Sequence, residues 1–443
     1  MVEKPTFSMT AVVAASLGGL LFGFDTAVIS GVTGALRDTF NLSAIGLGAA
    51  VSAALWGTLA GALGAGKPGD AFGSRTVLLW VAVLYILSAL GCSLSQNLES
   101  LFFFRFIGGL AIGGSSVLAP VYISEVSPAE RRGFLVGLFQ FNIVLGILAA
   151  YLSNFLVGQL AGDALAWRLK LAVAAIPAVV FLLTLLRIPH SPRWLLTRGR
   201  LEEARAAIAR LHMGAPDAVI AEISRHGSRS EGAARLCWRQ HRKPILLALF
   251  IGMFNQLSGI NAILYYLNDI FAAAGFDSLS ADVQSVAVGV ANLLATAAAM
   301  AVIDRVGRKP LLLAGAAGTC AALVCVAAIY ASGRGEALLL PCLIGFIIFF
   351  AVSQGAVIWV YLSEIFPTSV RARGQALGSA THWIMNALIS FAFPVIAAQT
   401  LALPFWFFAA AMAAQVLVVW KVFPETRGVQ LEDMEAALTS RTA

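Results

Sequence analysis

The sequence predicts an all-α membrane protein whose twelve transmembrane helices form two six-helix halves. Twelve runs of about 20 apolar, nearly uncharged residues recur along the chain, and each can cross a bilayer core of about 30 Å as a helix. Charged residues make up 12% of the chain, against roughly 25% in soluble domains. Short motifs also recur at a nearly constant spacing, which indicates that the second six runs repeat the first six.

The predicted spans leave one long interruption, and it divides the chain. Residues 1–188 form an N-terminal half, 189–243 a cytoplasmic linker with helices, 244–423 a C-terminal half and 424–443 a cytoplasmic tail. In the linker, Leu201, Ala204, Ile208 and Leu211 stand at helical spacing and predict an amphipathic helix. The spans are expected at residues 9–31, 44–66, 76–95, 100–122, 134–157, 169–188, 244–270, 283–303, 310–332, 337–361, 374–397 and 402–423.

The net charge of +7 follows membrane topology and does not form a nucleic-acid-binding face. With the N-terminus placed inside and the spans alternating, 25 of the 30 Lys and Arg residues fall on the inner side and four on the outer side. Cytoplasmic loops carry such an excess, so we expect both termini in the cytoplasm. Short loops and tails favour a bacterial inner membrane.

The inner-side motifs show that the two halves are copies. Each motif that follows the second, fourth and sixth span returns 234 to 239 residues later, after the eighth, tenth and twelfth span. Parallel repeats of this kind bind their substrate near the middle of the membrane, between the halves. The paired segments are 70–75 with 304–309, 125–128 with 364–367, and 189–193 with 424–428.

These motifs resemble the sugar porter family of the major facilitator superfamily, both its bacterial proton–xylose and glucose symporters and the facilitative glucose transporters. The resemblance covers nearly the whole chain and implies the major facilitator fold and sugar transport. It is carried by the Gly-rich first span that ends in Asp25-Thr26, by Arg105-Phe-Ile-Gly-Gly, Pro120-x-Tyr122-x-x-Glu125-x-x-Pro128-x-x-x-Arg132-Gly133, Pro189-x-Ser-Pro-Arg-Trp-Leu195, Gln256-x-x-Gly259-Ile-Asn261 and Pro424-Glu-Thr-Arg-Gly428.

Charged residues of these motifs are expected to form a latch that closes the inner side in the outward-open state. A carboxylate at a helix end can accept from a helix N-terminus and pair with arginine, and a network of such pairs can bias one conformer. The alternative, that they are only topology and capping charges, stays open. Ser74 and Ala71 replace usual basic residues and His190 a usual glutamate, which predicts a weaker latch in the first half. The latch residues are Glu125, Arg132, Arg193, Asp304, Arg308, Glu364 and Arg371.

We expect the transport cycle to depend on the charge state of Asp25. A carboxylate inside an apolar span is costly and by default marks an ion or substrate path. Asp25 lies about 24 Å from the inner surface at 1.5 Å per residue, and Arg105 about 8 Å below the outer surface, so in a core of about 30 Å their depths coincide. The sequence therefore predicts an Asp25–Arg105 pair, and the family resemblance implies the same pair.

Such a pair could couple transport to protons. Burial and a nearby guanidinium act on a carboxylate in opposite directions, so a helix movement that separates them would load or release a proton. A static buried ion pair and a substrate-binding aspartate are the alternatives. Facilitative members of the family usually carry an uncharged residue here, which makes Asp25 the discriminating feature.

Polar side chains inside the apolar spans mark the expected substrate site. Amides donate and accept together, which suits vicinal hydroxyls, and an indole covers the apolar face of a pyranose. For any one amide, a role in helix–helix packing is the alternative. Tyr265 and Tyr266 are expected to form an outer gate, or simply to pack. The candidates for binding are Gln140, Asn255, Gln256, Asn261, Asn292, Trp359, His382, Trp383 and Asn386.

The expected function is proton-coupled symport of a neutral monosaccharide, hexose or pentose, by alternating access. A facilitative uniporter of sugars or polyols, with Asp25 structural, is the main alternative. A non-transporting membrane sugar sensor is a third. No metal set, nucleophile–base pair or phosphate loop suggests an enzyme, so no cofactor and no metal is expected. The expected partners are a small neutral sugar, a proton and the bilayer, with no nucleic acid, and a monomer is expected to suffice.

Overall fold

The structure is a computed structural model that describes residues 8–128, 131–227, 236–367 and 370–427, apart from the side chains of 163–164, 225–227, 304 and 372. Every regular element in these ranges is helical. Twelve helical stretches in them are long and apolar enough to cross a membrane, and the first runs from Met9 to Gly31 as expected. The prediction of an all-α protein with twelve spans is confirmed.

Contacts between residues divide the chain into two compact units. The first unit comprises Met1–Val28 and Ala53–Gly232, and the second Ile29–Ser52 and Ala233–Ala443. The segment between the first two spans thus groups with the C-terminal part of the chain. The predicted division at 189–243 stays a prediction, and of the predicted tail, residues 428–443 lie outside the described part.

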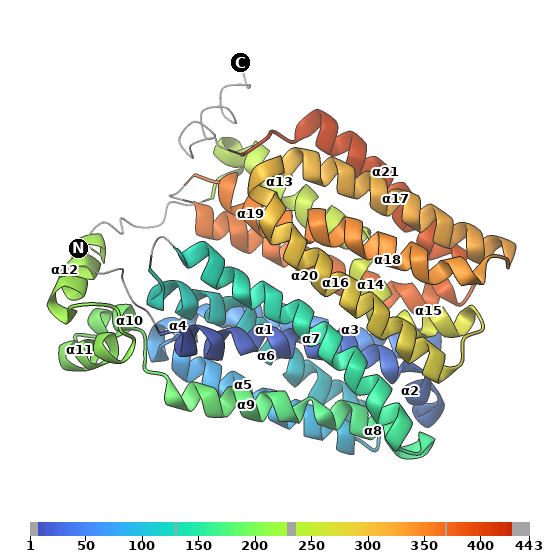
Figure 1. The fold of residues 1–443 in the computed structure, drawn as a ribbon, viewed down its shortest axis with the longest axis horizontal. Coiled ribbons are helices and arrows are strands. Elements are labelled where there is room, and N and C mark those ends of the chain that lie inside the picture. The colour runs from blue at the N-terminus through green and yellow to red at the C-terminus, as the bar shows by residue number, and fades with distance from the viewer. Residues whose placement is uncertain (1–7, 129–130, 228–235, 368–369, 428–443) are drawn as a thin grey trace. The chain divides into compact units, whose positions relative to one another are not determined.

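The first unit holds the spans of the N-terminal half and the linker helices (Figure 1). Helix α3 (Ala44–Gly64) runs without interruption across the boundary after Ser52. The other helices of this unit are α1 (Met9–Val28), α4 (Gly66–Phe72), α5 (Ser74–Leu94), α6 (Leu98–Val126), α7 (Arg132–Leu160), α8 (Asp163–Val173), α9 (Ala175–Arg187), α10 (Pro192–Thr197), α11 (Leu201–Arg210) and α12 (Pro216–Gly227).

The second unit begins with a 3-10 turn, η1 (Ile29–Gly31), and α2 (Thr33–Phe40), and two of its later spans are broken. Span seven is split into α13 and α14, and span ten contains a π-helical turn, η4. Its remaining elements are α13 (Trp238–Leu257), α14 (Ile260–Tyr265), α15 (Leu267–Ala273), α16 (Ser278–Val306), α17 (Arg308–Ser332), η3 (Glu336–Leu338), α18 (Leu339–Phe350), η4 (Ala351–Gly355), α19 (Ala356–Glu364), α20 (Arg371–Ala397) and α21 (Ala402–Val422).

The same pairs of spans contact each other in both units. Helix α1 packs on α7 as α13 packs on α20, α5 on α6 as α17 on α18, and α5 on α9 as α17 on α21. In the first unit, glycines let α1 and α7 touch: a Cβ at Gly23 would collide with the carbonyl of Ile143, and one at Gly146 with the carbonyl of Leu20. Small residues are the usual means of close helix contact in membranes.

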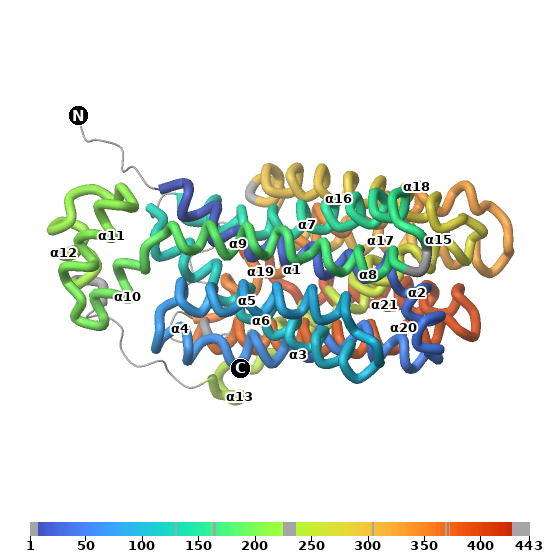
Figure 2. The backbone as a smooth tube through the Cα atoms, turned by 90° about the horizontal axis from the view of Figure 1, so that it is seen from below, coloured from blue at the N-terminus to red at the C-terminus, as the bar shows by residue number. Residues whose placement is uncertain are grey.

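The linker helices α10, α11 and α12 gather at one end of the first unit (Figure 2). Ala204, Ile208 and Leu211 are buried as the amphipathic pattern requires, whereas Leu201, the first residue of α11, is 42% exposed. The prediction for Leu201 is therefore wrong, because the apolar face begins one turn later. In each unit, we call the side that the chain reaches after an even-numbered span the linker side.

Candidate functional site

Asp25 and Arg105 meet inside the first unit. Asp25 lies near the end of α1 and Arg105 two turns into α6, and Nη1 of Arg105 is 3.2 Å from Oδ1 and 3.3 Å from Oδ2 of Asp25. The side chain of Arg105 is only 5% exposed. A buried guanidinium without a counter-ion would be costly, so the carboxylate is what allows Arg105 to lie here.

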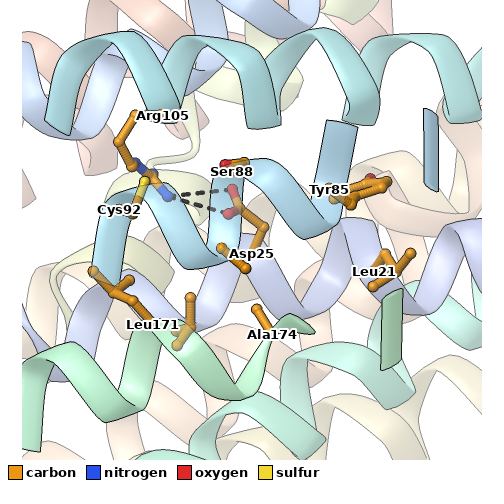
Figure 3. A pocket seen from close by; sticks show the side chains of 10 residues that line it. Leu21, Asp25, Tyr85, Ser88, Cys92, Arg105, Leu171 and Ala174 are labelled. Carbon is orange, nitrogen blue, oxygen red and sulfur yellow. Dashed lines mark hydrogen bonds and ion pairs between the residues drawn. The ribbon is translucent and has the colours of Figure 1, made fainter. Parts of the chain in front are cut away.

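A small cavity of about 20 Å³ adjoins the pair (Figure 3). Besides Asp25 and Arg105, its polar lining comes from one face of α5, namely Tyr85, Ser88 and Cys92. The Nε atom of Arg105 is buried and bonds to no described residue. The cavity has room for one water molecule, so the pair can exchange hydrogen bonds with water or with these hydroxyl groups.

A break in span seven brings three predicted amides together in the second unit. Gly259 has φ +81°, and a Cβ there would strike the ring of Phe408, so only glycine suits this position. The amide of Asn261 donates to Oε1 of Gln256 at 3.0 Å, and Nε2 of Gln256 donates to Oδ1 of Asn255 at 3.1 Å. Broken helices of this kind commonly form substrate sites in transporters.

His382 extends this chain of amides toward two indoles. Nε2 of Gln256 lies 3.2 Å from both ring nitrogens of His382, and an amide donor requires that the nitrogen it reaches offers a lone pair. The rings of Trp359 and Trp383 lie 5.3 and 5.1 Å from the His382 ring. Trp383 is buried, whereas 38% of Trp359 is exposed.

The two tyrosines predicted as a gate are tied to span eleven. Asn386 donates to the hydroxyl of Tyr265 at 3.3 Å, and the hydroxyl of Tyr266 donates to the carbonyl of Ser390 at 2.9 Å. Both tyrosines are buried. They therefore link α14 to α20, with Tyr265 in contact with the amide group of a predicted binding residue.

Two predicted binding residues form no hydrogen bond with this cluster among the described residues. Asn292 lies on α16 and makes no hydrogen bond with the described residues, and Gln140 lies on α7 in the first unit. Conversely, Gln354 was missed by the sequence reasoning. It is 2% exposed in η4, its carbonyl accepts from Asn255 at 3.4 Å, and its side-chain oxygen has no described partner. Gln354 is an amide inside an apolar span, which is the same sequence pattern that identified the other candidate amides.

On the linker side of the second unit, Arg308 and Glu364 form a closed ion-pair cluster. The guanidinium of Arg308 grips Glu364 at 3.2 and 2.9 Å, and Thr426 donates to the same carboxylate at 2.6 Å. Glu425 accepts from the backbone N–H groups of Arg308 and Lys309 at the start of α17. These backbone donors lower the pKa of Glu425 although burial opposes them.

In the equivalent cluster of the first unit, two other residues replace Arg308 and Glu425. Ser74 occupies the position of Arg308 and His190 that of Glu425. Glu125, the equivalent of Glu364, lies beside Ser191 and Arg193, and its Oε2 is buried without a described partner. The ring of His190 stacks on Trp194 at 5.0 Å, against Gly73.

The outer contacts of the two clusters remain alike. Nε of Arg75 donates to the carbonyl of Leu185 as Nζ of Lys309 does to that of Trp420. The hydroxyl of Tyr122 donates to the carbonyl of Pro189 as that of Tyr361 does to Pro424.

Two further latch candidates donate hydrogen bonds to backbone carbonyl groups. Arg132 donates to the carbonyl of Ser124 at 3.0 Å and Arg371 to that of Phe366 at 3.4 Å. Asp304 belongs to α16, and its side chain lies outside the described part of the chain.

Known proteins resemble this chain along nearly its full length. The family model for sugar and other transporters matches residues 11–438. The major myo-inositol transporter of Bacillus subtilis (strain 168) is 33% identical over 447 aligned positions, which cover 98% of this chain and 94% of that protein. The D-xylose–proton symporter of Escherichia coli (strain K12) is 35% identical over 474 positions, which cover 97% and 95%.

A solved structure gives the same result for the fold. The inward-open conformation of the xylose transporter from Escherichia coli superposes with a TM-score of 0.86 at 32% identity, covering 96% of this chain and 98% of that chain. The full-length family match and the shared fold identify the chain as a transporter and not an enzyme. The chain belongs to the sugar porter family of the major facilitator superfamily, and it is a multi-pass membrane transporter.

Proposed function

We propose that the protein is a proton-coupled symporter of a neutral monosaccharide that works by alternating access. The observation that carries the proposal is the buried Asp25–Arg105 pair, with both carboxylate oxygens within 3.3 Å of one guanidinium nitrogen. The named activity of the xylose–proton relative supports it. Asp25 is the proton carrier, and Arg105 is the cation that the proton replaces.

In this mechanism Asp25 binds either the guanidinium or a proton. When the two side chains separate, the carboxylate is left buried without its counter-ion, and protonation relieves that cost. When they meet again, Arg105 displaces the proton. The water-sized cavity lined by Tyr85 and Ser88 offers polar groups beside the carboxylate at which a proton can be exchanged.

The sugar contacts come from the amide chain and its aromatic neighbours. Gln256, Asn255 and Asn261 already satisfy one another, so a sugar's hydroxyl groups can take over those bonds without leaving an amide unpaired. His382 adds an acceptor, and Trp359, Trp383 and Asn386 complete the set. Gln140 and Asn292 are proposed to contribute from the other helices.

Proton coupling supplies enough free energy for accumulation. One proton that moves down about 100 mV yields roughly 2.3 kcal/mol. One pH unit adds about 1.4 kcal/mol. Together they limit accumulation to about 500-fold for one proton per sugar.

We further propose that the linker side is cytoplasmic, because alternating the spans along the sequence assigns 25 of the 30 basic residues to that side. Both termini are then inside, and the latch residues face the cytoplasm. We propose a bacterial inner membrane as the location. We also propose that the chain forms two six-helix halves joined by the linker.

The test is uptake of labelled glucose, xylose and galactose by proteoliposomes, with and without an imposed proton gradient. The wild type should accumulate one sugar only with the gradient, and Asp25→Asn should exchange that sugar without accumulating it. Asp38→Asn is the matched control, since Asp38 is exposed on α2 and should change nothing. Equal equilibration by wild type and Asp25→Asn, unaffected by the gradient, would instead establish a uniporter with a structural Asp25.

A polyol is the second candidate substrate. The similarity to the myo-inositol transporter favours it, and a cluster of amides suits any ring of vicinal hydroxyls. Labelled myo-inositol therefore belongs in the same uptake series. Transport of inositol alone would change the substrate class, and transport of neither would overturn the cargo assignment.

A further inference from the structure

The segment that follows the proton site is fastened, within the second unit, to the end of the sugar-binding span. Residues 29–52 group with the second unit, although α1, which ends at Val28, belongs to the first. Ile29, Thr33 and Leu36 are each no more than 1% exposed, and η1 packs against α14 and α15. The chain therefore passes from one unit to the other only four residues after Asp25.

One ion pair fastens this segment. Nη2 of Arg37 on α2 lies 3.4 Å from Oδ1 of Asp269 on α15. The two side chains are 47% and 24% exposed, and Oδ2 of Asp269 is buried without a described hydrogen-bond partner. Arg37 is thus the charged group that meets a largely desolvated carboxylate.

Helix α15 is itself held firmly, so the pair has a fixed anchor. Asn268 donates to Oδ1 of Asp282 on α16 at 2.5 Å, and the hydroxyl of Tyr330 on α17 donates to the carbonyl of Ile270 at 2.5 Å. Asp269 follows Tyr265 and Tyr266 by four and three residues, respectively. The chain from the two tyrosines to Asp269, the residue that Arg37 contacts, is therefore short.

We propose that Arg37 and Asp269 form a clasp that carries movement of the sugar-binding span to the end of α1, next to Asp25. Neither residue touches sugar or proton, so both are positioning residues. The inference rests on the proposed function for its role in coupling, but the existence of the clasp can be tested without transport. Coupling between distant sites needs a two-state element that both sites bias, and the docked or released segment 29–40 is that element.

The structure also indicates which substitutions isolate the clasp. Only Oδ1 of Asp269 contacts Arg37, and Oδ2 has no described hydrogen-bond partner, so an amide, whose oxygen can still accept from Arg37, should be tolerated at this position. Arg37→Glu instead places a second carboxylate beside Asp269, and its position on the exposed side spares the fold. If the repulsion is with Asp269, adding Asp269→Asn should remove it.

The experiment is hydrogen–deuterium exchange of the peptides covering residues 29–40, with wild type, Arg37→Glu, Asp269→Asn and the double variant. Exchange should rise roughly threefold in Arg37→Glu and return to the wild-type rate in the double variant. Arg334→Glu is the matched control, an exposed arginine on the same side whose side chain pairs with no described residue. Unchanged exchange in Arg37→Glu, or no recovery in the double variant, overturns the clasp.

The same four proteins then test the role in coupling. The dependence of sugar affinity on pH should flatten in Arg37→Glu and recover in the double variant. A normal dependence in Arg37→Glu, with faster exchange, would keep the clasp and reject its role. Absence of any such dependence in the wild type would reject the proposed symport instead, and leave the exchange result standing.

Discussion

Arg105 lies buried inside the first unit with the carboxylate of Asp25 against its guanidinium group. The sequence indicated this pair through the matching depths of the two residues, because an unpaired charge at that depth in a bilayer is energetically costly. The cavity beside the pair could not be predicted. Tyr85, Ser88 and Cys92 line it, but hydroxyls and thiols are common in ordinary helix packing and carry no signal of their own.

His190 gives the linker side a histidine whose pKa lies below its ordinary value. Burial, then Arg75 and Arg200, lower its pKa, and Glu203 opposes them. The neutral ring's contribution to stability is therefore complete above about pH 6.5 and is lost as the pH falls through and below that value. The melting temperature of the purified wild type should fall between pH 7.5 and 5.5.

The matched variant for this prediction is His190→Gln, which keeps a polar side chain but cannot titrate. Its melting temperature should fall less over the same pH range, because the remaining four histidines are common to both proteins. Equal falls in the two proteins would show that His190 does not sense pH.

At the scale of helices, the repeat explains which contacts the first half has lost. Arg308 grips Glu364 in one copy, while Ser74 leaves the equivalent Glu125 with a buried oxygen lacking a described partner in the other. The sequence showed the replaced residues. The structure adds that an arginine at position 74 would be the equivalent partner of Glu125. What the first half lacks is therefore one specific ion pair.

Ser74→Arg should restore that bond and stabilise the first unit, by roughly 1.5–3 kcal/mol for a charge-assisted pair. Arg308→Ser makes the opposite change in the other copy and should cost about 3–5 kcal/mol, because it strands Glu364. Thermal unfolding of the two variants in detergent tests both signs. A loss of stability in Ser74→Arg would mean that the pocket around Glu125 has closed over.

The contact between α1 and α7 supplies a second test at this scale. Gly146→Ala should prevent close packing, because its Cβ would collide with the carbonyl of Leu20. Gly137→Ala, in the same helix, meets nothing within 4 Å and should be neutral or stabilising by up to about 1 kcal/mol. Yield of folded protein by gel filtration compares them; equal yields would disprove the tight contact.

For the molecule as a whole, apolar runs and motif spacing predicted the twelve spans, because bilayer thickness fixes helix length so strictly. The association of Gln256, Asn255 and Asn261 also followed from spacing within one span. Residues 29–52 could not be assigned to a unit in this way. Their grouping depends on long-range contacts such as Arg37 with Asp269, separated by 232 positions, which leave no periodic trace.

The grouping of residues 29–52 has a consequence for how the polypeptide can be divided. The backbone passes between the units three times, after Val28, inside α3 and in the linker. A protein expressed as two fragments cut in the linker would therefore not consist of two self-contained pieces. The first fragment would carry residues 29–52, which pack against the second fragment. Reassembly would therefore resemble domain swapping. Each fragment alone would expose an uncovered packing surface and be a target for quality-control proteases.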